Sequence, residues 1–381
     1  MVCDRLFEII ESQKDFYIDV WDDISSIESP TDFKEGNDRI GEYFSKLAEE
    51  RGFKVDVCRQ SVSGDVVCIT MNSDINEAPI VFSGHIDTVH PIGSFGSKPT
   101  RRDGKNIYGP GVMDCKGGVV AAFAAMDALR TVGFSKRPVK LILQTDEEKN
   151  SRPSKKDTIR YMIEQSRGAI AFLNCESSKE NTLVLWRKGI VQFEFHIRGK
   201  SIHSSRCPIG VSAIAEAAQK ITQLEKMKDF EGLTCNCGVI NGGTSDNTVA
   251  AECYFTADIR FCDNSQLEQA RRIVKEIADK SFVGADCTLV ERPYRPAMAP
   301  SRLNDELLKK INEIYADNGL PLAEARLSLG GSDAAYTTDA GIPTVDSIGV
   351  EGDFIHTVNE YATLDSLKKS TKRLAAIAFC I

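Results

Sequence analysis

Histidine and acidic residues that suit a metal site recur along this chain of 381 residues. The first group is His85-Ile86-Asp87, which follows the apolar run Pro79–Ser83 after one glycine. Zinc accepts imidazole nitrogen and carboxylate oxygen, and a zinc site with an open position can bind a catalytic water. The residue types therefore predict a hydrolytic metal site. The other candidate ligands and bases are Asp114, Glu147, Glu148, Glu176 and His356.

The number of acids favours two metal ions over one. Two ions about 3.5–4 Å apart can hold both a carbonyl oxygen and an attacking hydroxide. Asp114, Glu148 and Glu176 supply three negative charges, and a bridging hydroxide supplies a fourth, which balances two divalent cations. We expect two divalent metal ions, with zinc as the first choice and cobalt or manganese as alternatives.

Each of these residues taken alone has a simpler explanation. An isolated His-x-Asp is better explained as a buried structural histidine beside a turn aspartate. Asp114 could simply favour the amino terminus of a helix that follows it, and most acidic runs are solvated surface charge. Glu176 and His356 could be ordinary loop residues. Only their joint appearance, in order and after apolar strand runs, favours the metal site.

The elements that must position these groups alternate between strand and helix. Such alternation predicts an α/β fold in which a mixed or parallel sheet is covered by helices. Ligands of these folds bind at the carboxyl ends of the strands, where His85 and Asp87 would lie. Hydrophobic periodicity predicts strands at 66–71, 80–83, 139–145 and 169–173, and helices at 33–50 and 116–132.

The pattern changes near Arg187 and returns to α/β after a stretch marked by prolines, Pro293–Pro300. Between them the order β-α-β-β-α-β predicts a small α+β sandwich. We therefore expect a discontinuous catalytic domain of residues 1–186 and 296–381, with residues 187–295 inserted as a lid and dimerisation domain. The predicted elements are strands at 190–197, 233–240, 252–261 and 287–290, and helices at 211–226, 265–281, 305–318 and 364–379.

The composition limits which binding partners and which cellular location are expected. The net charge of −8 gives no reason to expect nucleic acid or an anionic membrane as partner. The beginning of the chain lacks a signal-peptide pattern, and no apolar run reaches membrane-spanning length. The 12 cysteines are spread along the chain, which indicates reduced core residues in a cytoplasmic protein.

Together, the segments that contain these candidate ligands and the base resemble those of the co-catalytic zinc peptidase and deacylase family. This family includes glutamate carboxypeptidase, acetylornithine deacetylase, succinyl-diaminopimelate desuccinylase and aminoacylase. The resemblance extends from about residue 79 to residue 369. It is nearest to the bacterial glutamate carboxypeptidase branch, through Tyr108–Gly111, Thr145–Lys149 and Gly331–Tyr336.

The resemblance implies a role for each candidate metal ligand. His85 and Glu176 would hold one ion, and Glu148 and His356 would hold the other. Asp114 would bridge the two ions. Each group of candidate residues named above therefore supplies one metal ligand.

Two further residues beside the ligands receive roles by the same resemblance. Asp87 would accept a hydrogen bond from the ring of His85 and so fix its tautomer. Glu147 would be the general base, taking a proton from the attacking water and passing it to the leaving amine. Adjacent glutamates make chemical sense here, because Glu148 can ligate the metal while its neighbour remains free.

The insert and one later loop also contain sequence motifs that resemble those of this family. Gly199–Ser205 resembles the motif whose histidine, here His203, stabilises the oxyanion and is often supplied by a partner subunit. Asn247 and Arg260 resemble the pair that grips the substrate, and a guanidinium suits a free carboxylate. Simpler explanations are a polar loop residue for His203 and a surface charge for Arg260. Gly330, Gly331 and Ser332 resemble the loop that lines the substrate pocket.

The chain departs from the family pattern at two positions. Cys115 follows the bridging aspartate where the family usually has Met, Asp or a similar residue, which suggests a site sensitive to oxidation. Ala250 replaces a proline that is common after the asparagine motif, so the role of Asn247 is less secure.

The expected function is release of a C-terminal amino acid from a short peptide or an N-acyl amino acid, by a homodimer. The alternative enzyme is an N-acyl amino acid deacylase of the acetylornithine deacetylase type. The non-enzyme alternative is a binding protein on a decayed hydrolase fold. Decay should first remove ligands or the base, yet all six expected residues are present.

Overall fold

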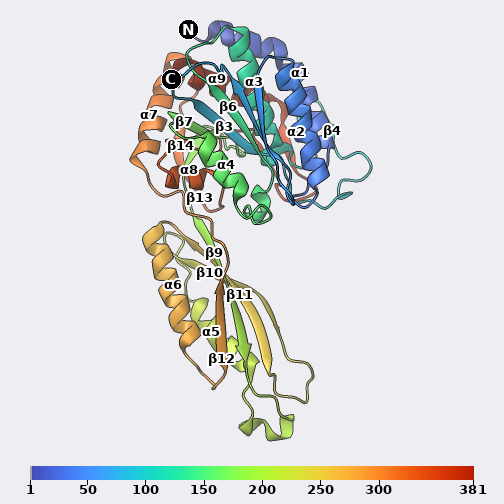
Figure 1. The fold of residues 1–381 in the computed structure, drawn as a ribbon, viewed down its shortest axis with the longest axis vertical. Coiled ribbons are helices and arrows are strands. Elements are labelled where there is room, and N and C mark those ends of the chain that lie inside the picture. Colours follow the sequence, from blue (N-terminus) through green and yellow to red (C-terminus); the bar gives the residue numbers. More distant parts are fainter. Residues whose placement is uncertain (1) are drawn as a thin grey trace. The chain divides into compact units, whose positions relative to one another are not determined.

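The computed structural model describes residues 2–381, which form two compact units (Figure 1). The first unit comprises residues up to Leu185, Pro300–Leu327 and Ser332–Ile381. The second comprises Trp186–Ala299 and Ser328–Gly331. Among residues 2–381, no helix combines the length and the apolar character needed to cross a bilayer.

The first unit is built on a six-stranded mixed sheet in the order β1-β2-β6-β3-β7-β14. Strand β3 is parallel to β6 and β7, whereas β2 is antiparallel to both of its neighbours. The central strands are apolar and almost wholly buried, as expected for a sheet covered on both faces. The strands are β1 (Lys54–Cys58), β2 (Val66–Met71), β3 (Ile80–His85), β6 (Val139–Gln144), β7 (Ala171–Asn174) and β14 (Thr344–Val345).

Helices cover the two faces of this sheet. Alternate side chains of β3 point to opposite faces, so Ser83 contacts Met162 of α4 while Gly84 approaches Val119 of α3. Helix α3 is buried along nearly its whole length because α1 and α9 pack against it as well. The helices are α1 (Asp4–Ser26), α2 (Lys34–Glu49), α3 (Gly117–Thr131), α4 (Asp157–Gln165), α7 (Arg302–Asp317), α8 (Ala334–Asp339) and α9 (Leu364–Cys380).

Close packing brings the start of α3 against the end of β7. A Cβ atom at Gly118 would lie 1.8 Å from the Cys175 carbonyl oxygen, so only glycine allows this approach. The short turns beside the sheet are a π-helical turn (Val112–Lys116) and a 3-10 turn (Glu147–Lys149). The remaining strands are β4 (Arg101–Arg102), β5 (Asn106–Tyr108), β15 (Gly352–Asp353) and β16 (Tyr361–Thr363) in one small sheet, and β8 (Thr182–Arg187) with β13 (Glu324–Ser328) in another.

The second unit is an antiparallel sheet in the order β10-β11-β9-β12 with two helices on one face. Strand β9 alternates buried residues with half-buried or exposed ones, which is typical of a sheet with one covered face. Phe195 and Phe255 stack at 4.3 Å in the core between sheet and helices. The elements are β9 (Gly189–Arg198), β10 (Thr234–Gly242), β11 (Glu252–Phe261), β12 (Asp286–Glu291), α5 (Ala213–Leu224) and α6 (Asn264–Asp279).

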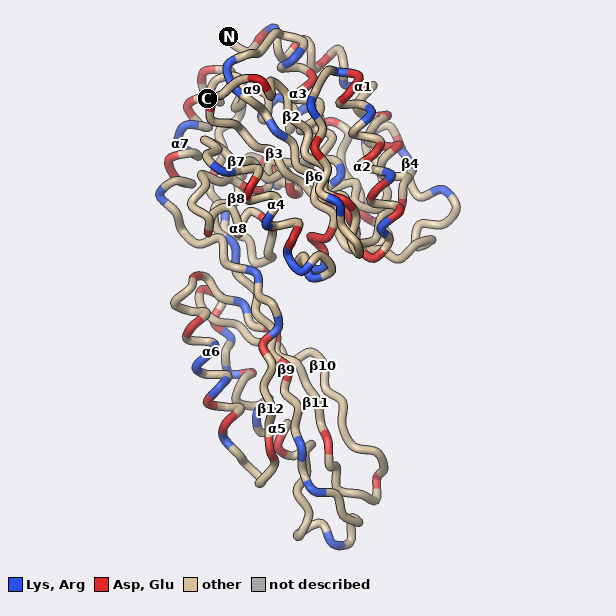
Figure 2. The backbone as a smooth tube through the Cα atoms, in the orientation of Figure 1, with Lys and Arg blue, Asp and Glu red and all other residues tan. Residues whose placement is uncertain are grey.

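Both helices of this unit begin with a side-chain cap. The hydroxyl of Ser212 accepts the N–H of Ala215, and the carboxylate of Asp263 accepts the N–H of Gln266 at 2.9 Å. Acidic and basic residues are interspersed along α6 (Figure 2). Lys275 pairs with Asp279 there, one turn apart.

The predicted α/β class, with a mixed sheet covered by helices, is confirmed. The helix predicted over residues 116–132 corresponds to α3, and a separate turn of residues 112–116 precedes it. Strands β1 and β8 and helices α4 and α8 were not predicted. Helix α1 was not predicted, although Leu6, Tyr17 and Trp21 of this helix are buried.

Candidate metal centre

His85 is the last residue of β3 and is almost fully buried. Its ring Nδ1 lies 3.0 Å from the main-chain oxygen of Asp87. A carbonyl oxygen can only accept, so Nδ1 carries the proton and the lone pair of Nε2 is left free for a ligand. Nε2 faces Asp114 Oδ1 at 3.1 Å and Glu176 Oε1 at 3.6 Å. The expected contact with the Asp87 carboxylate is longer, at 3.4 Å.

Asp114 lies between two histidines. One carboxylate oxygen is 3.1 Å from His85 Nε2, and the other is 3.2 Å from His356 Nε2. His356 Nε2 is also 3.3 Å from Glu148 Oε2. The peptide bond after Asp114 is cis. The five predicted ligands therefore form two half-sites, His85 with Glu176 and His356 with Glu148, which share Asp114.

The half-sites contain more buried negative charge than their histidines can neutralise. Burial raises the pKa of Glu148 to about 7 and holds the pKa of Glu176 well above its usual range. The contact with Asp114, followed by that with Glu148, raises the pKa of His356 to about 10. Burial opposes a charge on His85, but nearby Cys115 and the acids raise its pKa overall. Bound cations would balance the excess negative charge that these raised pKa values indicate.

The Asp87 carboxylate holds the turn that carries the two adjacent glutamates. Its Oδ1 accepts the main-chain N–H of Glu147, and its Oδ2 accepts that of Glu148, each at 3.2 Å. Thr31 also donates its hydroxyl to Oδ2 at 2.7 Å. Asp87 thus contacts both the His85 end of the cluster and the Glu147-Glu148 turn. Sequence reasoning missed Thr31, because it lies far from every motif.

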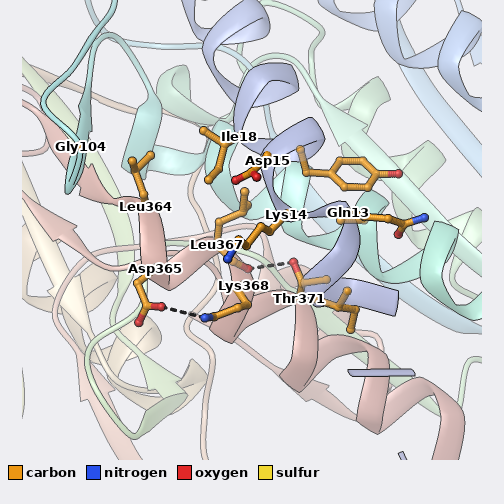
Figure 3. A pocket seen from close by; sticks show the side chains of 13 residues that line it. Gln13, Lys14, Asp15, Ile18, Gly104, Leu364, Asp365, Leu367, Lys368 and Thr371 are labelled. Carbon is orange, nitrogen blue, oxygen red and sulfur yellow. Dashed lines mark hydrogen bonds and ion pairs between the residues drawn. The ribbon is translucent and has the colours of Figure 1, made fainter. Parts of the chain in front are cut away.

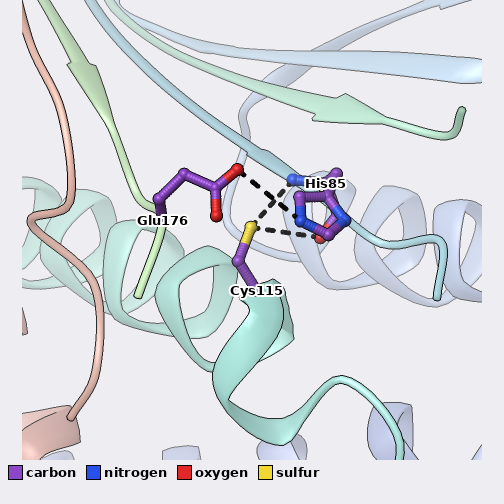
Figure 4. A group of neighbouring side chains, drawn as sticks. All are labelled: His85, Cys115 and Glu176. Carbon is purple, nitrogen blue, oxygen red and sulfur yellow. Dashed lines mark hydrogen bonds and ion pairs between the residues drawn. The ribbon is translucent and has the colours of Figure 1, made fainter. Parts of the chain in front are cut away.

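Cys115 lies directly beneath His85 (Figure 4). Its Sγ accepts the main-chain N–H of His85 at 3.0 Å, and His85, Cys115 and Glu176 form one group that could hold a metal ion. A second such group is His85, Asp114 and Glu148. Burial raises the pKa of the Cys115 thiol, so the reactive thiolate is disfavoured. This burial gives no support to the expected sensitivity to oxidation.

Glu360 is a buried acid next to the cluster that sequence reasoning did not single out. Its carboxylate accepts three main-chain N–H groups from the segment that ends at Asp114. Lys116, also buried, donates its ammonium to the Ile27 carbonyl at 2.9 Å. Desolvation lowers the pKa of Lys116 to about 7, although Glu360 and Asp87 favour its charged form. The only sequence signal for Glu360 is its place shortly after His356.

The residues predicted in the insert lie in the second unit, at two separate places. His203 and Asn247 are neighbours, because His203 pairs with Thr248 and the N–H of Ser204 donates to the Asn247 carbonyl at 2.8 Å. Both side chains are exposed. Arg260 lies at the other end of β11, where its guanidinium pairs with Asp258 at 2.7 Å.

The predicted glycine loop divides between the units. Gly330 and Gly331 belong to the second unit, where the Gly330 carbonyl accepts from Arg187 at 3.2 Å. Ser332 belongs to the first unit and is fully buried. Its hydroxyl donates to Asp346 at 2.5 Å, so this hydroxyl already has a partner within the protein.

A separate pocket of about 290 Å³ lies between α1 and α9 (Figure 3). Ile10, Ile18 and Leu367 supply apolar lining, and Lys368 at its edge pairs with Asp365 at 3.3 Å. None of the predicted site residues lines this pocket. It therefore offers no alternative location for the predicted chemistry.

Comparison with characterised protein sequences identifies relatives that span nearly the whole chain. Carboxypeptidase G2 of Pseudomonas sp. (strain RS-16) is 27% identical over 373 residues, which cover 96% of this chain and 89% of the relative. Succinyl-diaminopimelate desuccinylase of Rickettsia felis is 25% identical over 375 residues, which cover 93% and 96% of the two chains.

Solved structures share the fold. An aminopeptidase from Bacillus cereus superposes with a TM-score of 0.78 at 22% identity, covering 96% of this chain and 98% of that chain. An M20 family metallo-carboxypeptidase from Sulfolobus solfataricus gives a TM-score of 0.76 at 17% identity, covering 95% and 98%. The model of peptidase family M20/M25/M40 matches residues 81–379, a span that contains every predicted ligand. The chain belongs to peptidase family M20/M25/M40.

Proposed function

We propose that this protein is a two-metal hydrolase that releases a C-terminal amino acid from a short peptide or an N-acyl amino acid. The observation that carries the proposal is the position of Asp114, whose two carboxylate oxygens face different histidines at 3.1 and 3.2 Å. Each histidine has its own second acid, Glu176 or Glu148. This arrangement is what two ions sharing one bridging carboxylate require.

The donor set fits divalent metal ions. Imidazole nitrogen and carboxylate oxygen suit zinc, and they also accept cobalt and manganese. The raised pKa values of Glu148 and Glu176 indicate that their negative charges lack sufficient compensation among the protein groups. We propose zinc as the native metal, bound by His85, Asp114, Glu148, Glu176 and His356. When bound, two such ions polarise the scissile carbonyl and lower the pKa of the attacking water.

Glu147 is the proposed general base. Its main chain is fixed by Asp87, and its neighbour Glu148 belongs to the half-site of His356. A carboxylate at this place can accept a proton from the attacking water and return it to the leaving nitrogen. The same proton transfers are needed whether the leaving group is an amino acid from a peptide or from an acyl amide.

The second unit supports a role for a partner subunit. His203 and Asn247 lie beyond the Glu252 end of β11, while Arg260 lies near its other end. Ala251 and Arg260 are nine residue steps apart along extended strand, which is roughly 30 Å at 3.3 Å per step. One small substrate cannot contact both places on a single second unit. We therefore propose that Arg260 grips the substrate carboxylate in one subunit, while His203 and Asn247 come from the partner.

The edge strand of the second unit is the proposed dimer interface. Among residues 2–381, β10 pairs with β11 and otherwise makes a single bridge, between Thr234 and Lys228; its residues Val239 and Ile240 are half exposed. Ile214 of α5, also exposed, lies near Gly243 at the end of β10. Apolar residues on an open edge favour pairing with a second copy.

The deacylase alternative uses the same chemistry, and the relatives include both a carboxypeptidase and a desuccinylase. The deciding experiment compares turnover on dipeptides and on N-acetyl or N-succinyl amino acids, before and after chelation and metal restoration. The proposed function predicts metal-dependent hydrolysis in which dipeptides are turned over. Exclusive turnover of small-acyl substrates would favour the deacylase. Absence of turnover and of metal binding would contradict both.

We also propose a cytoplasmic location. Each of the 12 cysteines, from Cys3 to Cys380, is free. Six of them are buried in the cores of the two units, where they pack as small apolar side chains. Free buried cysteines are typical of proteins from a reducing compartment. Fractionation of cells that express the full chain would test this location.

A further inference from the structure

Glu360 is held at the edge of the metal cluster by the small sheet of the first unit. It directly precedes β16, which pairs with β5, and its own carbonyl accepts the N–H of Gly109 at 3.3 Å. Its side chain is 1% exposed. A charged group this deeply buried must be compensated by hydrogen bonds or by opposite charge.

The compensation comes from the segment that carries the bridging aspartate. Oε1 of Glu360 accepts the main-chain N–H groups of Met113 at 2.9 Å and Asp114 at 3.1 Å. Oε2 accepts that of Gly111 at 3.2 Å. His90 Nε2 lies 3.4 Å from Oε2. Three successive contacts from one short segment define the path of its main chain.

The segment adopts a backbone that needs such support. Gly111 has φ +73°, and a Cβ atom there would lie 2.8 Å from a methyl carbon of Thr88. The N–H groups of Met113 and Asp114 point to Glu360 instead of completing regular helical hydrogen bonds. Only past Lys116 does the regular helix α3 begin. The orientation of Asp114 therefore depends on a distant acid and not on its own helix.

We propose that Glu360 is a positioning residue for the bridging carboxylate: it holds residues 111–114 so that the two oxygens of Asp114 face separate metal half-sites. The inference rests on the proposed two-metal function. Glu360 acts on the ligands through the main chain, because its Oε1 accepts the N–H of Asp114 at 3.1 Å. Its removal should change metal binding by both half-sites.

The substitution Glu360→Gln tests the geometry with little change in size. An amide has one oxygen, so its NH₂ group must face either the N–H of Gly111 or those of Met113 and Asp114. In either orientation at least one buried donor loses its acceptor. The segment must then shift, and Asp114 with it.

Metal binding is the decisive readout, measured on the full chain after chelation. Zinc titration by calorimetry gives affinity and stoichiometry, and the visible spectrum of bound Co²⁺ reports ligand geometry. For Glu360→Gln we expect zinc affinity to fall about 10–100-fold, as is typical when a partner of a metal ligand is lost, and the Co²⁺ spectrum to change. The matched control is Glu351→Gln. Glu351 is half-buried and lies shortly before Glu360 in the sequence, and this variant should bind zinc as the unchanged chain does.

Glu360→Asp separates position from charge and covers the case in which Glu360→Gln does not fold. Aspartate keeps the charge but withdraws the carboxylate by about 1.5 Å. A positioning role predicts weaker zinc binding for Glu360→Asp too, whereas recovery of full affinity would overturn it. Thermal unfolding of the metal-free variants identifies a purely structural effect.

The outcomes distinguish this inference from the proposed function. Lower melting temperature with unchanged zinc affinity, stoichiometry and Co²⁺ spectrum in both Glu360 variants would overturn the positioning role alone. Failure of the unchanged chain to bind any divalent metal would overturn the proposed metal centre, and this inference with it. Weaker zinc binding in both variants, with Glu351→Gln unaffected, supports the inference.

Discussion

Asp87 holds the main chain of Glu147, because its Oδ1 accepts the Glu147 N–H at 3.2 Å. The other oxygen accepts the N–H of Glu148 at the same distance. One buried carboxylate therefore sets the positions of the proposed base and of one proposed metal ligand. Its backbone carbonyl also orients the ring of His85. Asp87 contacts three parts of the site, which suggests a larger effect on mutation than a tautomer-fixing role alone.

The substitution Asp87→Asn should lower both metal affinity and turnover. The amide NH₂ cannot accept, so one N–H of the Glu147-Glu148 turn loses its partner in a buried site. We expect zinc affinity to fall about 10–100-fold and kcat to fall as well. Thr31→Val is the matched control, because it removes only the hydroxyl bond to Asp87 and leaves both N–H contacts in place. Equal metal affinity and kcat in Asp87→Asn and the unchanged chain would contradict this role.

The substitution Glu147→Gln should abolish turnover without loss of metal. An amide cannot take a proton from water, and general acid–base catalysis contributes about 10²–10⁴-fold. We expect kcat to fall by at least that lower limit while metal content by elemental analysis stays unchanged. Glu164→Gln, an exposed change on α4, serves as the control. Wild-type turnover in a metal-loaded Glu147→Gln protein would exclude Glu147 as the base.

The sequence predicted the central strands and the order of ligands because both depend on local patterns. Buried strands appear as short apolar runs, and β2, β3 and β6 lie within a residue or two of the predicted ranges. His85 follows such a run after one glycine. In this sequence a histidine stands at one strand end and acids follow later strands. Because parallel strands end at one edge of a sheet, these side chains are expected to lie close together.

The supporting residues could not be predicted in the same way. Glu360 and Asp114 are joined by a main-chain hydrogen bond across 246 positions of sequence, and no local pattern reports such a contact. Thr31 reaches Asp87 from the connection between α1 and α2. The separation of His203 from Arg260 depends on the register of β11 with its neighbours, which side-chain alternation leaves open.

Asp127 should make the first unit sensitive to acid. Its buried carboxylate accepts the Tyr17 hydroxyl at 2.6 Å and pairs with Arg51 at 2.9 Å and Arg130 at 2.8 Å. Burial opposes its charge, but these partners lower its pKa overall. Because the folded pKa lies below the unfolded one, the stabilisation is present above the unfolded value, about 3.9. It is lost as the pH falls through the folded value.

The substitution Asp127→Asn tests this dependence. Leaving the Arg51 side chain, which is 14% exposed, without its partner should cost about 3–5 kcal/mol near neutral pH and lower the melting temperature. The difference from the unchanged chain should begin to narrow below about pH 4 and disappear only below the folded pKa, where Asp127 of the unchanged chain is protonated. Asp279→Asn, which breaks the exposed pair with Lys275, should cost under about 1 kcal/mol. A constant difference from pH 7 to pH 3 would contradict the assignment.

Subunit mixing should reveal whether His203 acts on the metal centre of its partner. His203→Ala and Glu147→Gln homodimers should each be nearly inactive, whereas a mixed dimer would contain one site with both residues intact. Random reassortment of equal amounts gives half mixed dimers, each with one working site of two, so activity should recover to about a quarter of the unchanged level. Mixing Glu147→Gln with Arg260→Ala is the control: both residues are proposed to serve the same subunit's site, so every site stays impaired. Recovery in the control, or none in the test mixture although mass spectrometry detects mixed dimers, would contradict the proposed division between subunits.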